Sequence, residues 1–140
     1  MEQAQRGRSK LNIALWILQV LLALLYLNAG FLKTFRPIQE IAPQIFWVTR
    51  LPEPLVRFIG ICEILGAVGL ILPAALKIRP QLATIAAAGL ALIMLLANIH
   101  HIYYGDFFVL PMTVTLLSLA AFIAYGRWKL SPFTIEHHAA

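Results

Sequence analysis

The chain has 140 residues, of which 61% are hydrophobic and only 12% are charged. A soluble domain is usually about 45–50% apolar, so this composition excludes a soluble globular protein and predicts an all-α integral membrane protein with one domain. The formal net charge of +5 comes mostly from residues at the ends of apolar runs. No basic face with accessible polar surface is visible, so we expect no nucleic-acid partner. The single cysteine, Cys62, can form neither an internal disulfide nor a CxxC dithiol.

Residues 1–10 are polar and basic, and we expect them to form a cytoplasmic N-terminus. The apolar run over 11–32 is long enough to be an uncleaved transmembrane helix. Residues 33–54 mix charged residues with prolines. Within them, isoleucines and Trp47 stand among polar positions between 38 and 48. This stretch is interpreted either as a short interfacial helix on the membrane surface or as an ordered loop.

Three further apolar runs predict spans at about 55–76, 81–102 and 107–125. A basic turn at 77–80 separates the first two of these runs, and a polar turn at 103–106 separates the last two. Together with the first span they predict a four-transmembrane-helix bundle over 11–126. Residues 127–140 are expected to be a cytoplasmic tail.

The distribution of lysine and arginine predicts the orientation of the chain, because cytoplasmic loops carry an excess of these residues. With the N-terminus inside, the inner segments hold seven of them: Arg6, Arg8, Lys10, Lys77, Arg79, Arg127 and Lys129. The outer segments then hold four: Lys33, Arg36, Arg50 and Arg57. We therefore expect both termini in the cytoplasm, with the lipid bilayer as the protein's main partner.

Glu63 stands near the middle of the second span. A carboxylate at such a position costs roughly 2.5–3.5 kcal/mol on insertion scales, so it should face the protein interior and have partners there. It is either a neutral, hydrogen-bonded structural acid or a proton carrier and ligand anchor. Glutamine at this position is the discriminating change, because a structural acid should tolerate it and a proton carrier should not.

Helical spacing places the polar and small residues of each span on one face. Tyr26 and Lys33 share a face of the first span, and Asn98 and His101 share one of the third. Gly60, Gly66 and Gly69 are predicted to let neighbouring helices approach closely. On the fourth span, the inward face is expected to carry Pro111, Thr115, Ser118, Phe122 and Tyr125.

The strongly polar residues of the spans gather in the predicted outer half of the bundle, and the inner half holds only Gln19, Thr84 and Ser118. No catalytic residue is assigned. The candidates for ligand binding or proton transfer are Glu63, Tyr26, Asn28, Lys33, Asn98 and His101. Each has a structural alternative, in which asparagines join helices and Tyr26 lies at the interface. Lys33 either extends to the surface, which is its structural alternative, or reaches inward towards Glu63. His100 and His101 point in different directions, so no metal site is expected.

Two motifs resemble the DoxX-like family of membrane proteins. The first is Asn28-Ala29-Gly30-Phe31-Leu32-Lys33, at the end of the first span. The second is Gly60-x-x-Glu63-x-x-Gly66-x-x-Gly69-Leu70, in the second span. The resemblance covers residues 11–126 and implies a small four-helix protein of the bacterial inner membrane. Some relatives are subunits of a thiosulfate:quinone oxidoreductase, and others associate with oxidative-stress enzymes. No catalytic set carries over.

The leading hypothesis is therefore a membrane subunit of a redox or quinone-linked system, with an outward-facing polar pocket around Glu63. Quinone is the candidate cofactor, because Tyr26, Asn98, His101 and Glu63 offer hydrogen bonds for its carbonyl groups. Redox proteins and further copies of the chain are candidate partners. The alternative is a non-enzymatic anchor or scaffold for partner proteins. A small-solute transporter is the third hypothesis, although a single four-helix unit lacks inverted repeats.

Overall fold

Four long helices make up most of the computed structural model, which describes residues 1–133. They are α1 (Glu2–Phe35), α3 (Glu53–Ala75), α4 (Gln81–Tyr104) and α5 (Leu110–Tyr125). The short helices η2 (Phe107–Val109) and η3 (Gly126–Leu130) extend α5 at its two ends. All four helical stretches are long and apolar enough to cross a membrane. The predicted all-α membrane fold is thereby confirmed, and residues 134–140 of the expected tail lie outside the described residues.

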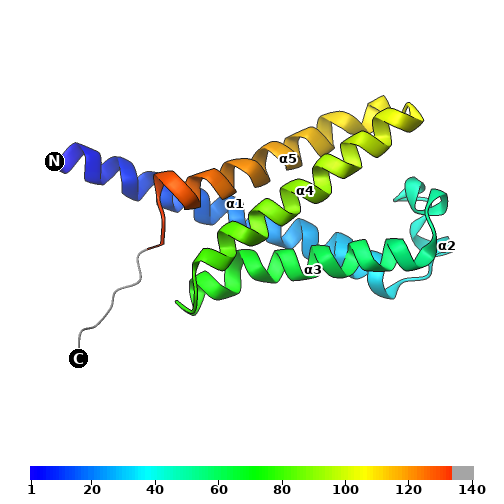
Figure 1. Ribbon diagram of the computed structural model, residues 1–140, viewed down its shortest axis with the longest axis horizontal. Coiled ribbons are helices and arrows are strands. Elements are labelled where there is room, and N and C mark those ends of the chain that lie inside the picture. Colours follow the sequence, from blue (N-terminus) through cyan, green and yellow to red (C-terminus); the bar gives the residue numbers. More distant parts are fainter. Residues whose placement is uncertain (134–140) are drawn as a thin grey trace.

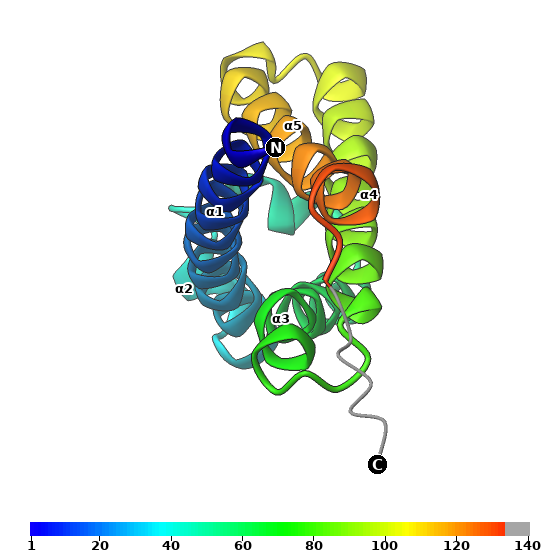
Figure 2. The ribbon, with the colours of Figure 1, turned by 90° about the vertical axis from the view of Figure 1, so that its left-hand side faces the viewer.

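The four helices form an elongated bundle (Figure 1). Helix α3 packs along α1 and along α4, and α4 packs along α5. Helices α1 and α5 contact each other over a shorter stretch. Seen from the end that holds the N-terminus, the helices surround a common centre in the order α1, α3, α4, α5 (Figure 2). Large apolar side chains cover the outside of the bundle, as expected for helices that face lipid.

The helix boundaries follow from residues near each end. Helix α1 ends where Arg36 adopts an extended conformation, because the following proline disfavours the helical conformation at that position. Helix α3 begins after Pro52 and has a proline in its first turn, where a missing N–H costs nothing. At its other end, α1 continues the helix back through residues 2–10, beyond the span expected from hydropathy.

The segment 36–52, called the connector below, joins α1 to α3 across one end of the bundle. It contains α2 (Ile38–Ile41) and η1 (Phe46–Arg50), so two short helices replace the single interfacial helix that was one of the two interpretations. Pro43 lies between them, and proline cannot donate the hydrogen bond that a continuous helix requires. Ile41 and Val48 of the connector pack with Val56 of α3 in a small apolar cluster.

The main core contains buried leucines and alanines from all four helices, joined by Tyr26 and Met94. Glycine allows the closest helix contacts. A Cβ atom placed on Gly60 would lie 2.9 Å from the carbonyl oxygen of Gly30, and one on Gly66 would lie 2.5 Å from the Leu90 side chain. A Cβ atom on Gly69 would lie 2.8 Å from that of Ala86. These three glycines thus stand where α3 meets α1 and α4.

The predicted inward faces agree with the structure for the first three spans and disagree for the fourth. Thr113, Ala120 and Ile123 are the buried residues of α5, whereas the face predicted from Thr115 and Ser118 is exposed. The hydroxyl groups of these last two residues donate to carbonyl oxygens four residues earlier in the same helix. Because its own backbone satisfies them, such a side chain need not point inward.

Candidate functional site

The most unusual feature of the bundle is an ion pair between α1 and α3. The Lys33 ammonium donates to both carboxylate oxygens of Glu63, at 2.6 Å and 2.8 Å. The side chains are only 7% and 1% exposed. Lys33 therefore reaches inward, the second of the two positions considered for it, and Glu63 has the partner that its burial requires.

The local backbone explains why these two side chains meet. Gly30 and Gly60 allow α1 and α3 to approach each other one helical turn from Lys33 and Glu63. Arg57 fixes the same region, since its Nη1 donates to the carbonyl oxygens of Lys33 and Arg36 at 2.8 Å and 2.6 Å. A cation at the C-terminal end of a helix also interacts favourably with the helix dipole. The end of α1 is thereby held against α3.

Two aromatic residues border the ion pair. The Lys33 ammonium lies 5.2 Å from the centre of the Trp47 ring of the connector, within cation–π range. Tyr26 lies two helical turns before Lys33 on the same buried face of α1 and is 3% exposed. Its hydroxyl group is buried without a hydrogen-bond partner among the described residues. A buried polar group in this state usually has a water molecule or a ligand as its partner.

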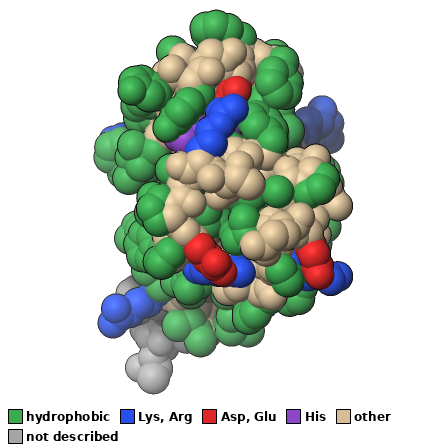
Figure 3. All heavy atoms as spheres, turned by 90° about the vertical axis from the view of Figure 1, so that its right-hand side faces the viewer, with side chains coloured by type: hydrophobic (Ala, Val, Ile, Leu, Met, Phe, Trp, Pro, Cys, Tyr) green, Lys and Arg blue, Asp and Glu red, His purple; other side chains and the backbone are tan. Residues whose placement is uncertain are grey.

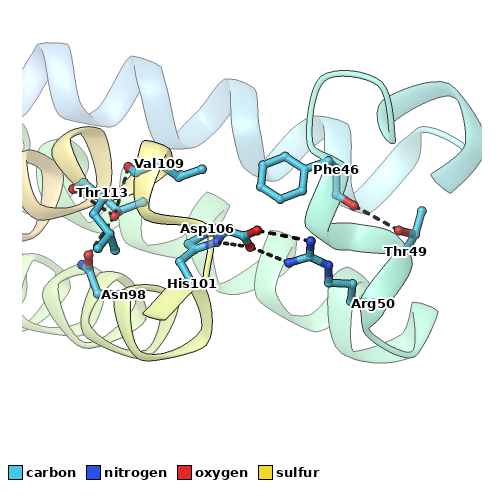
Figure 4. A network of polar contacts seen from close by, with 9 residues as sticks. Phe46, Thr49, Arg50, Asn98, His101, Asp106, Val109 and Thr113 are labelled. Atoms are coloured by element: carbon cyan, nitrogen blue, oxygen red, sulfur yellow. Dashed lines mark hydrogen bonds and ion pairs between the residues drawn. The ribbon is translucent and has the colours of Figure 1, made fainter. Parts of the chain in front are cut away.

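A second polar group joins the connector to the turn between α4 and α5 (Figure 4). The Arg50 guanidinium forms two hydrogen bonds with the Asp106 carboxylate, and His101 Nδ1 lies 3.2 Å from the same carboxylate. The three residues are called the latch below. The hydrogen bond from Arg50 holds the pKa of Asp106 below its usual range, and partial burial opposes this effect. Asp106 therefore stays ionised throughout the physiological pH range.

The end of α4 places Asp106 beside His101. Gly105 adopts the left-handed conformation, with φ of 76°, and the Asp106 N–H donates to the His101 carbonyl oxygen at 2.8 Å. This is the Schellman arrangement that glycine favours after a helix. Asp106 was not among the residues selected from the sequence, although Gly105 after a long helix is a signal for this turn.

Aromatic rings surround the latch. The Phe46 ring lies 6.0 Å from that of His101 and 5.4 Å from that of Phe108. The Arg50 guanidinium lies over the Phe46 and Tyr104 rings. Figure 3 looks onto this end of the bundle, where charged side chains stand among large apolar ones. The connector and its latch thus cover the end of the bundle that contains Lys33 and Glu63.

The remaining candidates occupy separate positions. Asn98 accepts a hydrogen bond from Thr113 at 2.8 Å and donates to the Met94 carbonyl oxygen, so it joins α4 to α5. Asn28 is exposed on α1 and does not join the buried group. The sequence-predicted residues therefore divide into the ion pair with Tyr26, the latch with His101, the Asn98 contact, and Asn28 alone.

A third buried polar group lies at the opposite end of the bundle. Arg127 of η3 is 2% exposed, and its Nε donates to the Gln19 side chain at 2.6 Å while Nη1 donates to Asn12 at 2.6 Å. Gln19 in turn donates to the Leu70 carbonyl oxygen. Gln19 is one of the three polar residues expected in this half, whereas the burial of Arg127 was not anticipated from the sequence. Position near the end of an apolar run did not distinguish a buried arginine from one in the membrane interface.

Within residues 1–133, no three His, Cys, Asp or Glu side chains lie close enough to hold a metal ion. The ion pair is also closed in this structure, because Glu63 is 1% exposed. The site can thus be described as a buried charge pair with an unsatisfied phenol beside it, covered by a connector that the latch ties to the end of α4.

Comparison with known families gives a match over residues 17–123 to the model described as the DoxX-like family. Searches among curated proteins and among solved structures gave no match in either set.

Proposed function

The chain belongs to the DoxX-like family, and from this premise we propose that it is a quinone-binding membrane subunit of a redox system. Quinone binding would take place at the Lys33–Glu63 pair, beneath the connector. The observation that carries the proposal is the buried Tyr26 hydroxyl, which no described residue accepts from or donates to. A quinone carbonyl oxygen is an acceptor for such a group, and the Lys33 ammonium is a donor for the same head group.

The surroundings suit an amphipathic ligand. The Trp47 ring beside Lys33 offers a flat apolar surface for the quinone ring. The seam between α1 and α5, whose contact is the shortest between neighbouring helices, gives the isoprenoid tail a route to lipid. In this proposal the chain binds and orients the quinone, while a partner protein supplies the electrons.

Tryptophan fluorescence tests the proposal directly. We expect decylubiquinone to quench the fluorescence of the purified protein in a saturable manner. Tyr26→Phe removes only the hydroxyl and should weaken binding about tenfold, which corresponds to one hydrogen bond of about 1.4 kcal/mol. Tyr103→Phe is the matched control, since Tyr103 is 82% exposed. Equal affinity of the Tyr26 variant and the wild type would contradict the proposal.

A second candidate function is a scaffold for partner proteins, and the closed state of the pair favours it. With Glu63 1% exposed and fully paired, the pair can serve only to fix α1 against α3, as buried ionic groups do in some proteins. This alternative predicts that neither decylubiquinone nor another quinone binds saturably, and that loss of the pair affects stability alone.

We also propose that both termini lie in the cytoplasm of a bacterial cell, so that the connector faces the outside. The lysine and arginine count supports this orientation. A reporter active only in the cytoplasm should give signal when fused after Ala140 and none when fused after Tyr104. The reverse result would place the connector in the cytoplasm.

A further inference from the structure

Arg127 holds a positive charge inside the bundle, and no acidic side chain within residues 1–133 pairs with it. Its hydrogen-bond acceptors among the described residues are all uncharged: the side chains of Gln19 and Asn12 and the carbonyl oxygen of Ser131. The residue is nevertheless 2% exposed. Burial of a charge is costly unless an opposite charge compensates for it. We therefore expect an anion to bind next to this guanidinium.

One nitrogen of the guanidinium has no acceptor. Nη2 of Arg127 is buried without a hydrogen-bond partner within residues 1–133. The rings of Phe133 and Trp16 lie 4.1 Å and 5.4 Å from its Cζ atom, and they hold the plane of the group in place. The guanidinium is therefore oriented, with one donor edge left for an acceptor that the described residues do not provide.

Arg127 also contributes to the lining of a groove. Its lining combines Arg127 with Gln81 and Thr84 at the start of α4, and with the apolar side chains of Ile85 and Trp128. The lining thus contains both polar donors and apolar side chains. This combination fits a phosphate group that carries an acyl chain.

The position of the groove in the bundle agrees with a lipid as the occupant. The turn between α3 and α4 and the helix η3 lie at the same end of the molecule (Figure 1). That end carries the exposed Lys77 and Arg79 of the turn. Lys77 and Arg79 both adopt positive φ, at 55° and 45°, which is uncommon outside glycine. Basic pockets between membrane helices on the cytoplasmic side bind anionic lipid headgroups, and the orientation proposed above puts this end of the bundle on that side.

We propose that the groove lined by Arg127 binds the phosphate of an anionic phospholipid, with the Arg127 guanidinium as the compensating cation. Gln81 and Thr84 supply further hydrogen bonds, and an acyl chain lies along Ile85 and Trp128. This site is independent of the quinone site proposed at Lys33 and Glu63. The helix η3 and the connector lie at opposite ends of the bundle (Figure 1).

Thermal unfolding of the full chain in a neutral detergent tests the proposal. Phosphatidylglycerol at about 100 times its Kd should raise the Tm by about 5–11 °C. Phosphatidylcholine at the same concentration and inorganic phosphate at the same concentration should raise it by less than half as much. Lys129→Gln removes an exposed cation from the same short helix and should leave the response to phosphatidylglycerol unchanged.

Two variants address the site itself. Arg127→Gln should abolish the response to phosphatidylglycerol. Thr84→Trp keeps Arg127 and fills the groove, so it should abolish the response as well, and it decides the matter if Arg127→Gln fails to fold. A chain that ends at Phe133 should respond as the full chain does.

Other results would overturn the proposal. One is a full response to phosphatidylglycerol in Thr84→Trp or in a folded Arg127→Gln variant. Another is an equal response to inorganic phosphate, which would reveal a simple anion site. A response that grows when residues 134–140 are removed would identify the chain's own tail as the occupant.

Discussion

Breaking the ion pair between Lys33 and Glu63 should destabilise the protein strongly, and removing both charges should restore much of the loss. Glu63→Gln leaves the Lys33 ammonium buried without a counter-charge, and Lys33→Met leaves the carboxylate in the same position. Both side chains are less than a tenth exposed. For such a pair, removal of one partner costs about 3–5 kcal/mol, whereas replacement of both by uncharged groups is often nearly neutral.

The chain contains its own control for this experiment. Arg36 and Glu40, four residues apart in the connector, form an ion pair with side chains 58% and 57% exposed. An exposed pair of this kind contributes about 0.3–0.5 kcal/mol. Glu40→Gln should therefore change stability by about a tenth as much as Glu63→Gln, although the chemical substitution is identical. The difference between the two variants isolates the effect of burial.

Thermal unfolding in detergent, with all four Lys33/Glu63 combinations, measures the coupling. A loss of about 3 kcal/mol corresponds to a Tm lower by about 6–12 °C in a chain of this size. We expect Glu63→Gln and Lys33→Met each to show such a fall, and the double variant to lie within a few degrees of the wild type. If the two single effects were small, or if they simply added in the double variant, the buried pair would not be ionised and the reasoning would fail.

Two further predictions concern packing and the latch. Gly66→Leu should lower stability by about 1–3 kcal/mol through overpacking against Leu90, whereas Gly89→Leu, where a Cβ atom meets nothing within 4 Å, should be tolerated in the same unfolding assay. Arg50→Gln should free the connector from Asp106, so amide exchange over residues 36–52 should rise relative to the helices. Because Asp106 has a lowered pKa in the folded protein, the latch should hold above pH about 4, the ordinary pKa of aspartate, and weaken as the pH falls further. Exchange that stays equally slow in the Arg50 variant and in acid would show that the latch does not hold the connector.

The burial of most candidate polar residues was predictable, because helix periodicity is reliable in long apolar runs. The shared faces of Tyr26 with Lys33 and of Asn98 with His101 followed from spacings of three and four residues. The ion pair itself was one of two alternatives for Lys33, because a lysine near a span end can extend to the surface or turn inward. The close approach of Gly30 and Gly60, which decides between them, depends on how two helices dock.

The contact of Asp106 with Arg50 and the burial of Arg127 were not predicted, because both depend on contacts between segments far apart in the sequence. Asp106 follows a helix-ending glycine, but its partner Arg50 comes from the connector, and no local pattern joins them. Arg127 has the same sequence context as an interfacial arginine, and only the packing of η3 against α1 buries it. The discovery of the ion pair also changes one expectation: Glu63→Gln, which a lone structural acid would tolerate, now leaves an unpaired ammonium.

Mass spectrometry of the small molecules that copurify with the protein tests the central claim most directly. The wild type, purified in a mild detergent from bacterial membranes, should carry quinone in a stoichiometric amount. The double variant Lys33→Met/Glu63→Gln, which should remain folded, ought to carry little or none. Equal quinone content in both preparations, or none in the wild type, would contradict a quinone site at the buried pair and favour the scaffold.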